Sequence, residues 1–444
     1  MASLPNSPNT NGKQVIIARY DRMRWQALFG IFIGYAAYYI LRNNLLLSSP
    51  DLISHFHFTK QDIGFLSGTM LVAYGLSKGV MSVIADKTNP KYFMLIGLAM
   101  SGVVNIMMGF GTVFWIFFFL CILNGIFQGM GAGPSYVILA NWFPHKIRGS
   151  ATAIFNASHN LGGGLIAPIA GLGIAWLGQN HWQSAYFFVP VAVATIIAII
   201  FYFVGLGKPT QEHLPPLNEI ITNDTNSQGK ADDINTLDYS TWFILKNYIF
   251  TNRNIWYVSF LDAFSYMIRL GVLTWLPLYL LEVKGFSKTE VATTFAIFEW
   301  SAIPSTLLAG YVTDTLFKGH RMPLAVLCLL GVAMAITIYW MSHSLLVVML
   351  SAGIVGAFIY VPMFLASLQA IEVVPPFAAG SATGMRGLIS YIVGGSAGTA
   401  LFGVLAEHYG WDAGFYFLFF AIIGAIVCCY MVSRGLKASN KRST

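Results

Sequence analysis

The stretch Gly34-Tyr-Ala-Ala-Tyr38-Tyr39-Ile-Leu-Arg42-Asn43-Asn44 lies inside the first long apolar segment and places an arginine there. An arginine inside a membrane helix costs several kcal/mol unless a partner neutralises it, so Arg42 is a candidate functional residue. About half a chain later, Ser265-Tyr266-Met-Ile-Arg269-Leu-Gly-Val-Leu-Thr274-Trp275 again places an arginine three residues after a tyrosine. Two such guanidinium groups facing each other predict a site for a doubly charged oxyanion, most simply a phosphate.

The composition is that of a membrane protein. Of the 444 residues, 56% are hydrophobic and only 10% are charged, against roughly 25% charged in soluble domains. The mean hydropathy is +0.65, and many apolar runs reach the roughly 20 residues that a helix needs to cross a bilayer. We therefore predict an all-α polytopic protein with twelve spans and no large soluble domain.

The spans are expected to form two six-helix bundles. The first six cover residues 25–49, 62–85, 92–112, 114–140, 149–177 and 184–207, and the second six cover 255–281, 288–313, 323–341, 344–372, 380–406 and 412–434. The chain then divides into a cytoplasmic N-terminal segment (1–24), an N-terminal bundle (25–207), a polar, turn-rich cytoplasmic loop (208–254), a C-terminal bundle (255–434) and a cytoplasmic tail (435–444).

The distribution of basic residues predicts the orientation. With both termini in the cytoplasm, 18 of the 25 lysines and arginines lie inside, and only Lys60, Lys284 and Lys288 lie outside. The remaining four are within spans: Arg42, Lys78, Arg269 and Arg386. Because the bases are sorted by side and not clustered in a stripe, the net charge of +7 does not indicate nucleic-acid binding.

The two halves repeat one another. Gly149-Ser-Ala-Thr152 opens the fifth predicted span and Gly380-Ser-Ala-Thr383 opens the eleventh, 231 residues later. Asp86 and Asp314, after the second and eighth spans, are 228 residues apart, and the two central arginines are 227 apart. Nearly constant offsets indicate a duplicated six-span unit, an arrangement that puts a transport site on the pseudo-twofold axis.

Other polar residues in the spans have two interpretations each. The two central arginines either bind a ligand or form internal ion pairs. Lys78 lines a site or gates it, or it snorkels to the surface. His159, in Asn156-Ala-Ser-His159-Asn160, either joins two helices through a hydrogen bond or lines a cavity. Arg386 lies near the start of the eleventh span, where snorkelling is its expected behaviour.

Buried acids are expected beside these bases, because a cluster of cations would be destabilised when empty. Glu299 and Asp262 are the two carboxylates deepest in the spans, and Glu299 is expected to pair with one of the bases. A P-loop, zinc-ligand spacing and a serine–histidine–acid series do not occur. The sequence therefore predicts neither an enzyme nor an ATP-driven pump, and no cofactor or metal.

Several motifs resemble a known family. Asp86-Lys-Thr-Asn-Pro90 and Asp314…Lys318…Arg321 resemble the signature loops of the major facilitator superfamily. Within that superfamily, the chain resembles more narrowly the organophosphate:phosphate antiporters, and the resemblance extends through essentially all twelve spans. The motifs that carry it are the opening stretch, Tyr74-Gly-Leu-Ser-Lys78, Phe127-Gln-Gly-Met-Gly131, His159-Asn-Leu-Gly-Gly-Gly164 and Tyr266…Arg269…Trp275.

The resemblance implies a monomeric carrier in the bacterial inner membrane that exchanges an organic phosphate, best matched as glycerol-3-phosphate, for inorganic phosphate. By the same resemblance, the substrate-binding residues are Arg42, Arg269, Lys78, His159, Tyr38, Tyr266, Tyr360 and Tyr391, with Glu299 as the buried acid. Thr274 and Asn43 depart from the glycerol-3-phosphate pattern, where an acid and a lysine are expected, and Arg386 adds a cation. Hexose-6-phosphate or phosphoglycerate exchange, a sugar-phosphate sensor and a proton-coupled carrier using Asp262 or Glu299 remain alternatives.

Overall fold

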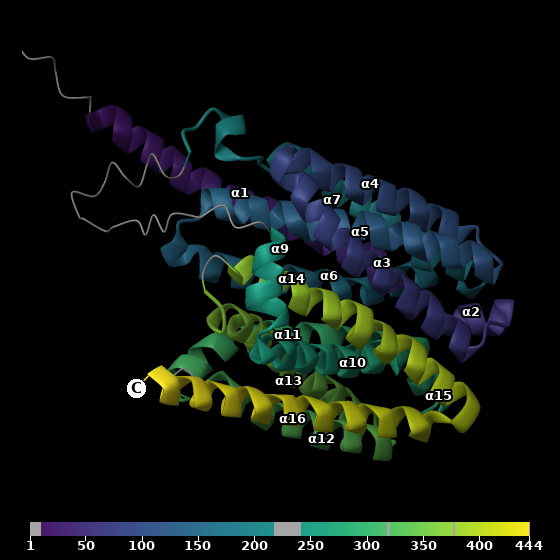
Figure 1. Cartoon of the computed structure of the whole chain (residues 1–444). Helices are drawn as coiled ribbons and strands as arrows, with labels where there is room; N and C mark the ends of the chain where they lie inside the picture. Colours follow the sequence, from purple (N-terminus) through teal and green to yellow (C-terminus); the bar gives the residue numbers. More distant parts are fainter. Residues whose placement is uncertain (1–9, 217–240, 318–319, 376–377, 444) are drawn as a thin grey trace, which may run out of the picture.

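The computed structural model describes residues 10–216, 241–317, 320–375 and 378–443, and these residues form helices joined by short connections (Figure 1). The N-terminal half contains α1 (Thr10–Leu47), α2 (Ser49–Phe56), α3 (Lys60–Lys87), α4 (Pro90–Gly109), α5 (Phe114–Trp142), α6 (His145–Leu177) and α7 (Val189–Val204). The C-terminal half contains α9 (Thr241–Ile244), α10 (Arg253–Glu282), α11 (Lys288–Thr315), α12 (Arg321–Met341), α13 (Leu345–Glu372), α14 (Ala379–Ile389), α15 (Phe402–Tyr409) and α16 (Trp411–Ser443).

Eleven of the predicted spans are recovered as helical segments long and apolar enough to cross a membrane, among the described residues. The first predicted span lies in α1, which has 38 residues and is long enough. Its average hydropathy is lowered by the residues of the opening stretch, which include Tyr35, Tyr38, Arg42 and Asn44. All of these side chains are buried inside the protein. The polar residues that weaken this span as a membrane segment are therefore those that face the interior.

The helices gather into two bundles, α1 to α7 and α10 to α16 (Figure 1). Four main contacts join them: α1 meets α10 at the centre, α2 also packs on α10, α6 packs along α11, and α3 packs along the segment from α14 to α15. The α1–α10 pair joins two helices that are counterparts in the repeat. The α6–α11 and α3–α14/α15 contacts correspond to each other, because α6 matches the α14 to α15 segment and α3 matches α11. The bundles meet about the axis that the internal repeat predicts, and the two arginine-bearing helices are the innermost pair.

The repeat extends to the way in which helices begin. At the start of α3, Thr59 and Asp62 form a reciprocal capping box, in which each side chain accepts a hydrogen bond from the other's backbone N–H. Ser287 and Glu290 form the same capping box at the start of α11, 228 residues later. Because a capping box satisfies two otherwise unpaired N–H groups, it fixes where the helix starts. Lys60 and Lys288 consequently occupy the same first helical position in the two halves.

Matched glycines set how closely the central helices approach their neighbours. A Cβ atom on Gly162 of α6 would lie 2.1 Å from the carbonyl oxygen of Ala36, and a Cβ on Gly394 would lie 2.1 Å from that of Ala263. Ala36 is six residues before Arg42, and Ala263 is six before Arg269. In each half, the arginine helix is therefore held by a backbone crossing at which only glycine fits, about one and a half turns from the guanidinium.

The eleventh span is not a uniform α-helix. Between α14 and α15, residues Ser390–Gly395 and Ala397–Leu401 form two turns with the wider π-helical spacing. Such turns are uncommon and occur preferentially at functional sites. Tyr391 lies in the first of them, and it faces the centre of the protein.

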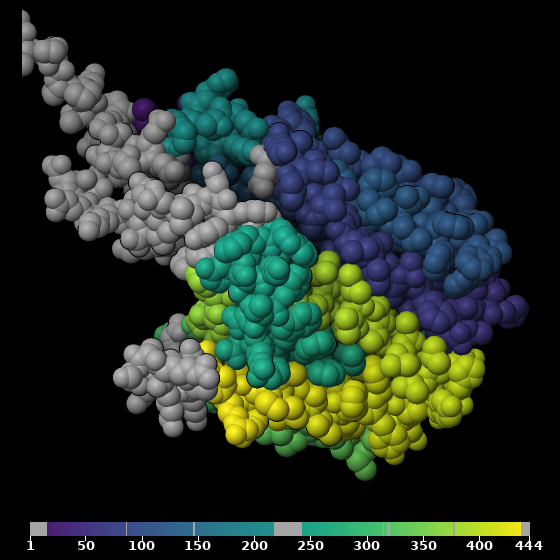
Figure 2. All heavy atoms as spheres, in the orientation of Figure 1, coloured from purple at the N-terminus to yellow at the C-terminus, as the bar shows by residue number. Residues whose placement is uncertain are grey.

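The end of the protein that holds α2 and α15 is sealed between the bundles, and Figure 2 shows the two halves in contact there. Lys60 Nζ lies 3.0 Å from Glu282 Oε2, and the Lys60 backbone N–H donates to Glu407 Oε2 at 2.9 Å. Lys288 Nζ lies 2.6 Å from Asp51 Oδ1. Each of these contacts joins the start of the second span of one half, α3 or α11, to a carboxylate of the other half.

Candidate functional site

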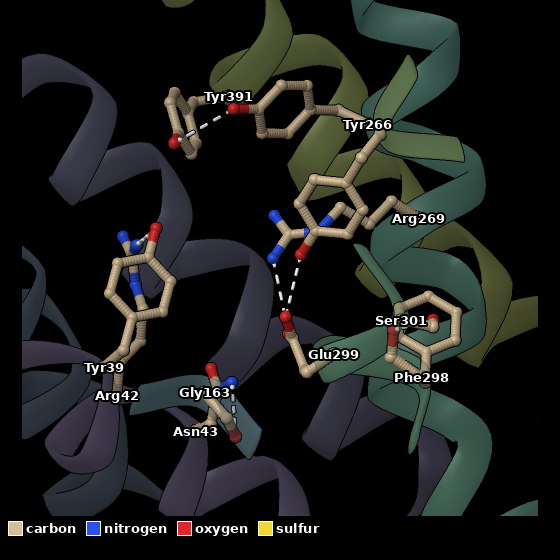
Figure 3. Close-up of polar contacts among 11 residues, drawn as sticks. Tyr39, Arg42, Asn43, Gly163, Tyr266, Arg269, Phe298, Glu299, Ser301 and Tyr391 are labelled. Carbon is tan, nitrogen blue, oxygen red and sulfur yellow. Dashed lines mark hydrogen bonds and ion pairs between the residues drawn. The ribbon is translucent and has the colours of Figure 1, made fainter. Parts of the chain in front are cut away.

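The two central arginines line one cavity. Arg42 reaches it from α1 and Arg269 from α10, and Figure 3 shows the two side chains on opposite sides of the gap between the bundles. Both residues are 5% exposed, so each charge is removed from water. The free space is small, about 20 Å³, which is close to the room needed by one water molecule. The protein thus presents two buried cations to one narrow pocket whose remaining lining is largely apolar.

Arg42 has no carboxylate partner among the described residues. Its Nη1 donates to the Tyr39 hydroxyl at 3.0 Å, and its guanidinium lies 3.8 Å from the centre of the Tyr74 ring. The Nε and Nη2 groups are buried and have no hydrogen-bond partner. A cation–π contact of this kind is worth about 2 kcal/mol when desolvated, far less than the cost of burying the charge. Arg42 therefore has unused donors beside the cavity.

Arg269 is only partly neutralised. Its Nη2 lies 3.4 Å from Glu299 Oε1, which is long for an ion pair, and its Nε has no partner (Figure 3). Glu299, on α11, is fully buried and accepts a shorter hydrogen bond of 2.8 Å from the Tyr360 hydroxyl. The Arg269 guanidinium also lies 4.5 Å from the Tyr360 ring. Glu299 pairs with a base, as expected from the sequence, but the pairing is loose enough to be replaced by a better acceptor.

The cavity also has polar side chains that were not predicted to bind substrate, of which Ser67 is new and Thr274 and Asn43 were noted only as departures from the family pattern. Ser67 on α3 and Thr274 on α10 both line it, and the hydroxyl of each is buried without a hydrogen-bond partner. Asn43 also lines it and donates to the Gly163 carbonyl at 3.4 Å. Unsatisfied hydroxyl groups next to unsatisfied guanidinium donors are costly unless a ligand or water occupies the space between them.

Lys78 and His159 lie beside the same centre. The Lys78 ammonium is 5.6 Å from the centre of the Tyr391 ring, and the side chain is half-buried. The His159 ring lies between the two bundles, 5.3 Å from the ring of Tyr39 and 5.9 Å from that of Tyr360. Neither side chain turns outward to the lipid, but neither lines the small central cavity itself; each contacts aromatic rings around it.

Two of the four tyrosines predicted to bind substrate contact each other at the cavity. The Tyr266 hydroxyl donates to the Tyr391 hydroxyl at 3.1 Å (Figure 3). Tyr38 does not join them, contrary to the interpretation from the sequence: its hydroxyl donates to the Met94 carbonyl at 2.7 Å inside the N-terminal bundle. Successive residues on a helix point about 100° apart, so Tyr39 faces the pocket while Tyr38 faces its own bundle.

The expected snorkelling of Arg386 is wrong. Its guanidinium forms an ion pair with Asp262 of α10, and the side chain is 13% exposed. Ser390 also donates to the same carboxylate oxygen of Asp262. Leaving the fully buried Asp262 carboxylate without a cation would cost more free energy than moving the Arg386 guanidinium away from the membrane surface. The pair therefore forms within the C-terminal bundle. It lies two helical turns from Arg269 along α10, next to Tyr391.

The residues of the predicted signature loops are only partly described. The side chains of Asp86 and Asp314 lie outside the described residues, although both positions fall near helix ends. Arg321 forms an ion pair with Glu372 at 2.9 Å, which connects the start of α12 to the end of α13. Among the side chains that the structure describes, no cluster of three acidic, histidine or cysteine residues suited to a metal is found.

Comparisons with known proteins agree with this geometry. The chain is 50% identical over 423 residues to the phosphoglycerate transporter protein of Salmonella typhimurium (strain LT2), covering 94% of this chain and 90% of that one. It is 37% identical to the glycerol-3-phosphate transporter of Bacillus subtilis (strain 168), covering 92% of each. A crystal structure of a bacterial homolog to the human lysosomal transporter Spinster, inward-facing and occupied, has a TM-score of 0.71 at 15% identity, over 92% of this chain and 96% of that one.

The duplicated bundles, the central cavity and these relatives lead to one assignment. Residues 31–399 match the family described as the Major Facilitator Superfamily, which covers most of the chain. The two bacterial relatives above are named as transporters of phosphorylated compounds, not as enzymes. The chain belongs to the Major Facilitator Superfamily and is a membrane transporter.

Proposed function

We propose that the protein exchanges a phosphorylated three-carbon compound, with phosphoglycerate as the preferred substrate, for inorganic phosphate by alternating access. The observation that carries the proposal is the pair Arg42 and Arg269, one from each bundle, at a single cavity with unused N–H donors. Guanidinium groups bind phosphoryl oxygens through two parallel hydrogen bonds, so this geometry suits a phosphate dianion.

The charge arrangement also supports exchange. Without an anion, the two buried cations repel each other across the gap, and only Arg269 has a carboxylate nearby among the described residues. A bound phosphate dianion replaces this repulsion by attraction to both bundles, which lowers the energy of the states in which the bundles close on the site. An empty carrier lacks that stabilisation and reorients slowly, so outward and inward movements of anions are coupled.

Two features support phosphoglycerate over glycerol-3-phosphate. The first is the 50% identity to a phosphoglycerate transporter protein. The second is the additional cation Arg386, held by Asp262 next to Tyr391, which lines the cavity. Phosphoglycerate has a carboxylate as well as a phosphate group, and Lys78 is the base placed to attract that second charge, with Arg386 available when it separates from Asp262. Tyr266, Tyr360 and His159 then surround the carbon skeleton.

The proposed orientation puts both termini in the cytoplasm. The proposed functional unit is a monomer. The start of α1 and the end of α16 lie at one end in Figure 1, and α2 and α15 lie at the other. The bases of the second end include Lys60, Lys284 and Lys288, which are the few predicted to be outside. In this orientation, the ion pairs at Lys60 and Lys288 seal the periplasmic end.

Counterflow in proteoliposomes tests the proposal. Vesicles loaded with inorganic phosphate should take up labelled phosphate rapidly, and vesicles without an internal anion should not. External 3-phosphoglycerate should compete more strongly than glycerol-3-phosphate or glucose-6-phosphate. Uptake that is independent of internal anion contradicts exchange, and uptake driven by a pH gradient into phosphate-free vesicles indicates proton coupling instead.

Binding without counterflow would identify a receptor and not a carrier. Phosphate binding to the purified protein, measured by calorimetry, separates the two: a carrier binds and exchanges, and a sensor only binds. The Arg42→Ala variant serves as the control for specific binding, because it removes one half of the proposed clamp.

A further inference from the structure

A second cavity lies between the bundles, away from the arginines. It has a volume of about 510 Å³ and lies between α6 and α11, with the end of α1, α2 and part of α10 behind it. Most of its lining is apolar, and small residues such as Ala167, Ala175, Ala292 and Ala296 create the space. Leu172, which also lines it, is 72% exposed. In a protein that spans a bilayer, an apolar groove with such exposed walls opens to lipid and not to water.

The groove has the length of one lipid leaflet. Along α11 its lining runs from Lys288 to Trp300, and along α6 it continues from Ala167 to Gln179 just beyond the helix end. Each run advances by about 18 Å, slightly more than the roughly 15 Å of half the hydrocarbon core. Trp300 closes the deep end, where its Nε1 donates to the Leu161 carbonyl of α6 at 3.4 Å. The groove therefore runs from the membrane surface to the middle of the bilayer.

The shallow end of the groove has opposite charges. Lys288 Nζ contacts Asp51 Oδ1 and, at 3.2 Å, Gln179 Oε1, while its side chain remains 36% exposed. Asp51 is nearly fully buried, and its Oδ2 has no hydrogen-bond partner of normal geometry, although Tyr186 lies beside it. A carboxylate oxygen can accept two hydrogen bonds, and with only the Tyr186 hydroxyl beside it the buried Oδ2 has room for a further donor.

We propose that this groove binds a zwitterionic phospholipid whose headgroup bears an ammonium with N–H donors. One acyl chain fills the apolar groove, the phosphate contacts Lys288, and the ammonium donates to Asp51 Oδ2. The headgroup and the ion pair then form a ring of four alternating charges. An anionic headgroup such as phosphatidylglycerol offers Asp51 only neutral hydroxyl donors and adds a net negative charge beside the carboxylate, and a quaternary ammonium has no N–H. The geometry is independent of the proposed substrate, and only the name of the leaflet, periplasmic, rests on the orientation proposed above.

Gly171 offers a clean way to fill the groove. It lines the cavity, and a Cβ atom added there meets nothing within 4 Å. Gly171→Leu thus starts a side chain in the acyl-chain space from a Cβ that meets no atom, and it replaces a poor helix former by a good one. Gly149 lies on the same helix near its other end, is exposed, and also has no atom within 4 Å of an added Cβ. Gly149→Leu is the matched control.

The test uses the full-length purified protein, delipidated in detergent, with phosphatidylethanolamine, phosphatidylcholine or phosphatidylglycerol added back. Thermal unfolding and native mass spectrometry report stabilisation and bound lipid. We expect phosphatidylethanolamine to raise the unfolding midpoint most and to remain bound to wild type and Gly149→Leu, but not to Gly171→Leu. Asp51→Asn should weaken phosphatidylethanolamine binding about tenfold and remove its advantage over phosphatidylcholine, as expected for the loss of a charge-assisted hydrogen bond.

Two results would overturn the proposal. Equal retention of lipid by the Gly171→Leu and Gly149→Leu variants would show that the groove is not the binding site. Equal stabilisation of wild type by the three headgroups would show that the Lys288–Asp51 pair does not select the ligand. Neither outcome depends on transport, so failure of the phosphate-exchange proposal leaves this test intact.

Discussion

Lys288 Nζ lies 2.6 Å from Asp51 Oδ1, and this contact joins the first turn of α11 to α2 of the opposite bundle. Lys60, at the equivalent position of α3, forms the corresponding contact with Glu282 at the end of α10. The internal repeat thus produces two crosswise ion pairs at one end of the molecule. Any movement that opens this end must break both.

Reversing the charge at one of these pairs should favour opening. In Lys60→Glu, attraction to Glu282 becomes repulsion, and the helix-capping contact with Glu407 is weakened as well. Because the pair is partly exposed, each contact is worth only about 0.2–1 kcal/mol, so we expect a severalfold change. Ser67→Cys in the central cavity reports it, through labelling by an impermeant thiol reagent added at the α2 and α15 end. The four native cysteines are all buried and contribute little background.

The double variant Lys60→Glu/Glu282→Lys is the control for this experiment. It restores an ion pair of opposite polarity, and it should return the labelling rate toward that of the protein carrying Ser67→Cys alone. A labelling rate that is unchanged by Lys60→Glu would show that the ion pair does not hold this end closed.

Replacing Arg42 with lysine tests the geometry of the proposed clamp. The substitution keeps the charge but loses the planar pair of donors. We expect phosphate counterflow to fall at least about tenfold, since a hydrogen bond to a charged group is worth about 1.5–3 kcal/mol. Arg253→Lys, at an exposed position at the start of α10, should transport normally. Near-normal counterflow by Arg42→Lys would argue against bidentate binding.

Neutralising Glu299 should tighten anion binding and slow exchange. Glu299→Gln removes the carboxylate 3.4 Å from Arg269, so the pocket gains positive charge and releases phosphate more slowly. We expect the phosphate dissociation constant to fall severalfold and the maximal counterflow rate to fall with it. The empty variant should also unfold at a lower temperature than wild type, with phosphate restoring more of the difference. Glu372→Gln, in an exposed pair with Arg321, is the control. Unchanged affinity would mean that Glu299 does not compete with the substrate.

Neutralising Asp262 should change substrate preference. Asp262→Asn removes the partner of Arg386, and the released guanidinium adds positive charge next to Tyr391. Competition of labelled phosphate uptake should shift further toward 3-phosphoglycerate relative to glycerol-3-phosphate. Ser390→Ala removes only a hydrogen bond to Asp262 and should leave the ratio near that of wild type. An unchanged ratio in Asp262→Asn would place Arg386 outside the substrate's reach.

A methyl group at Gly162 should disturb the site through the backbone. The added Cβ in Gly162→Ala would lie 2.1 Å from the Ala36 carbonyl oxygen, so α1 must move away from α6. Overpacking of this kind typically costs about 1–3 kcal/mol, and the displacement is passed to Arg42 along the rigid helix. We expect a lower unfolding temperature together with weaker phosphate binding. Gly149→Ala on the same helix has open space around its Cβ and should affect neither.

The two-bundle fold and the central arginines could be predicted because duplication and membrane burial both leave strong patterns in a sequence. Contacts between distant helices leave no such pattern. Asp262 and Arg386 are 124 residues apart, and nothing local indicates that they pair. Tyr38 and Tyr39 both lie within about one turn of Arg42, so a helical period alone cannot tell which faces the pocket. Ser67 carried no signal because an isolated serine is ordinary in a membrane helix until a cavity is found beside it.

The π-helical turns at Ser390–Gly395 and Ala397–Leu401 have a consequence for how this chain can diverge. Removing one residue there would restore regular α-helical spacing, but it would rotate the helix before the deletion by about 100° relative to the helix after it. Tyr391 and the Arg386 guanidinium would then swing away from their partners on α10. Insertions and deletions between 386 and 401 should accordingly be harder to tolerate than single exchanges of side chains, because they change the spacing on which these contacts depend.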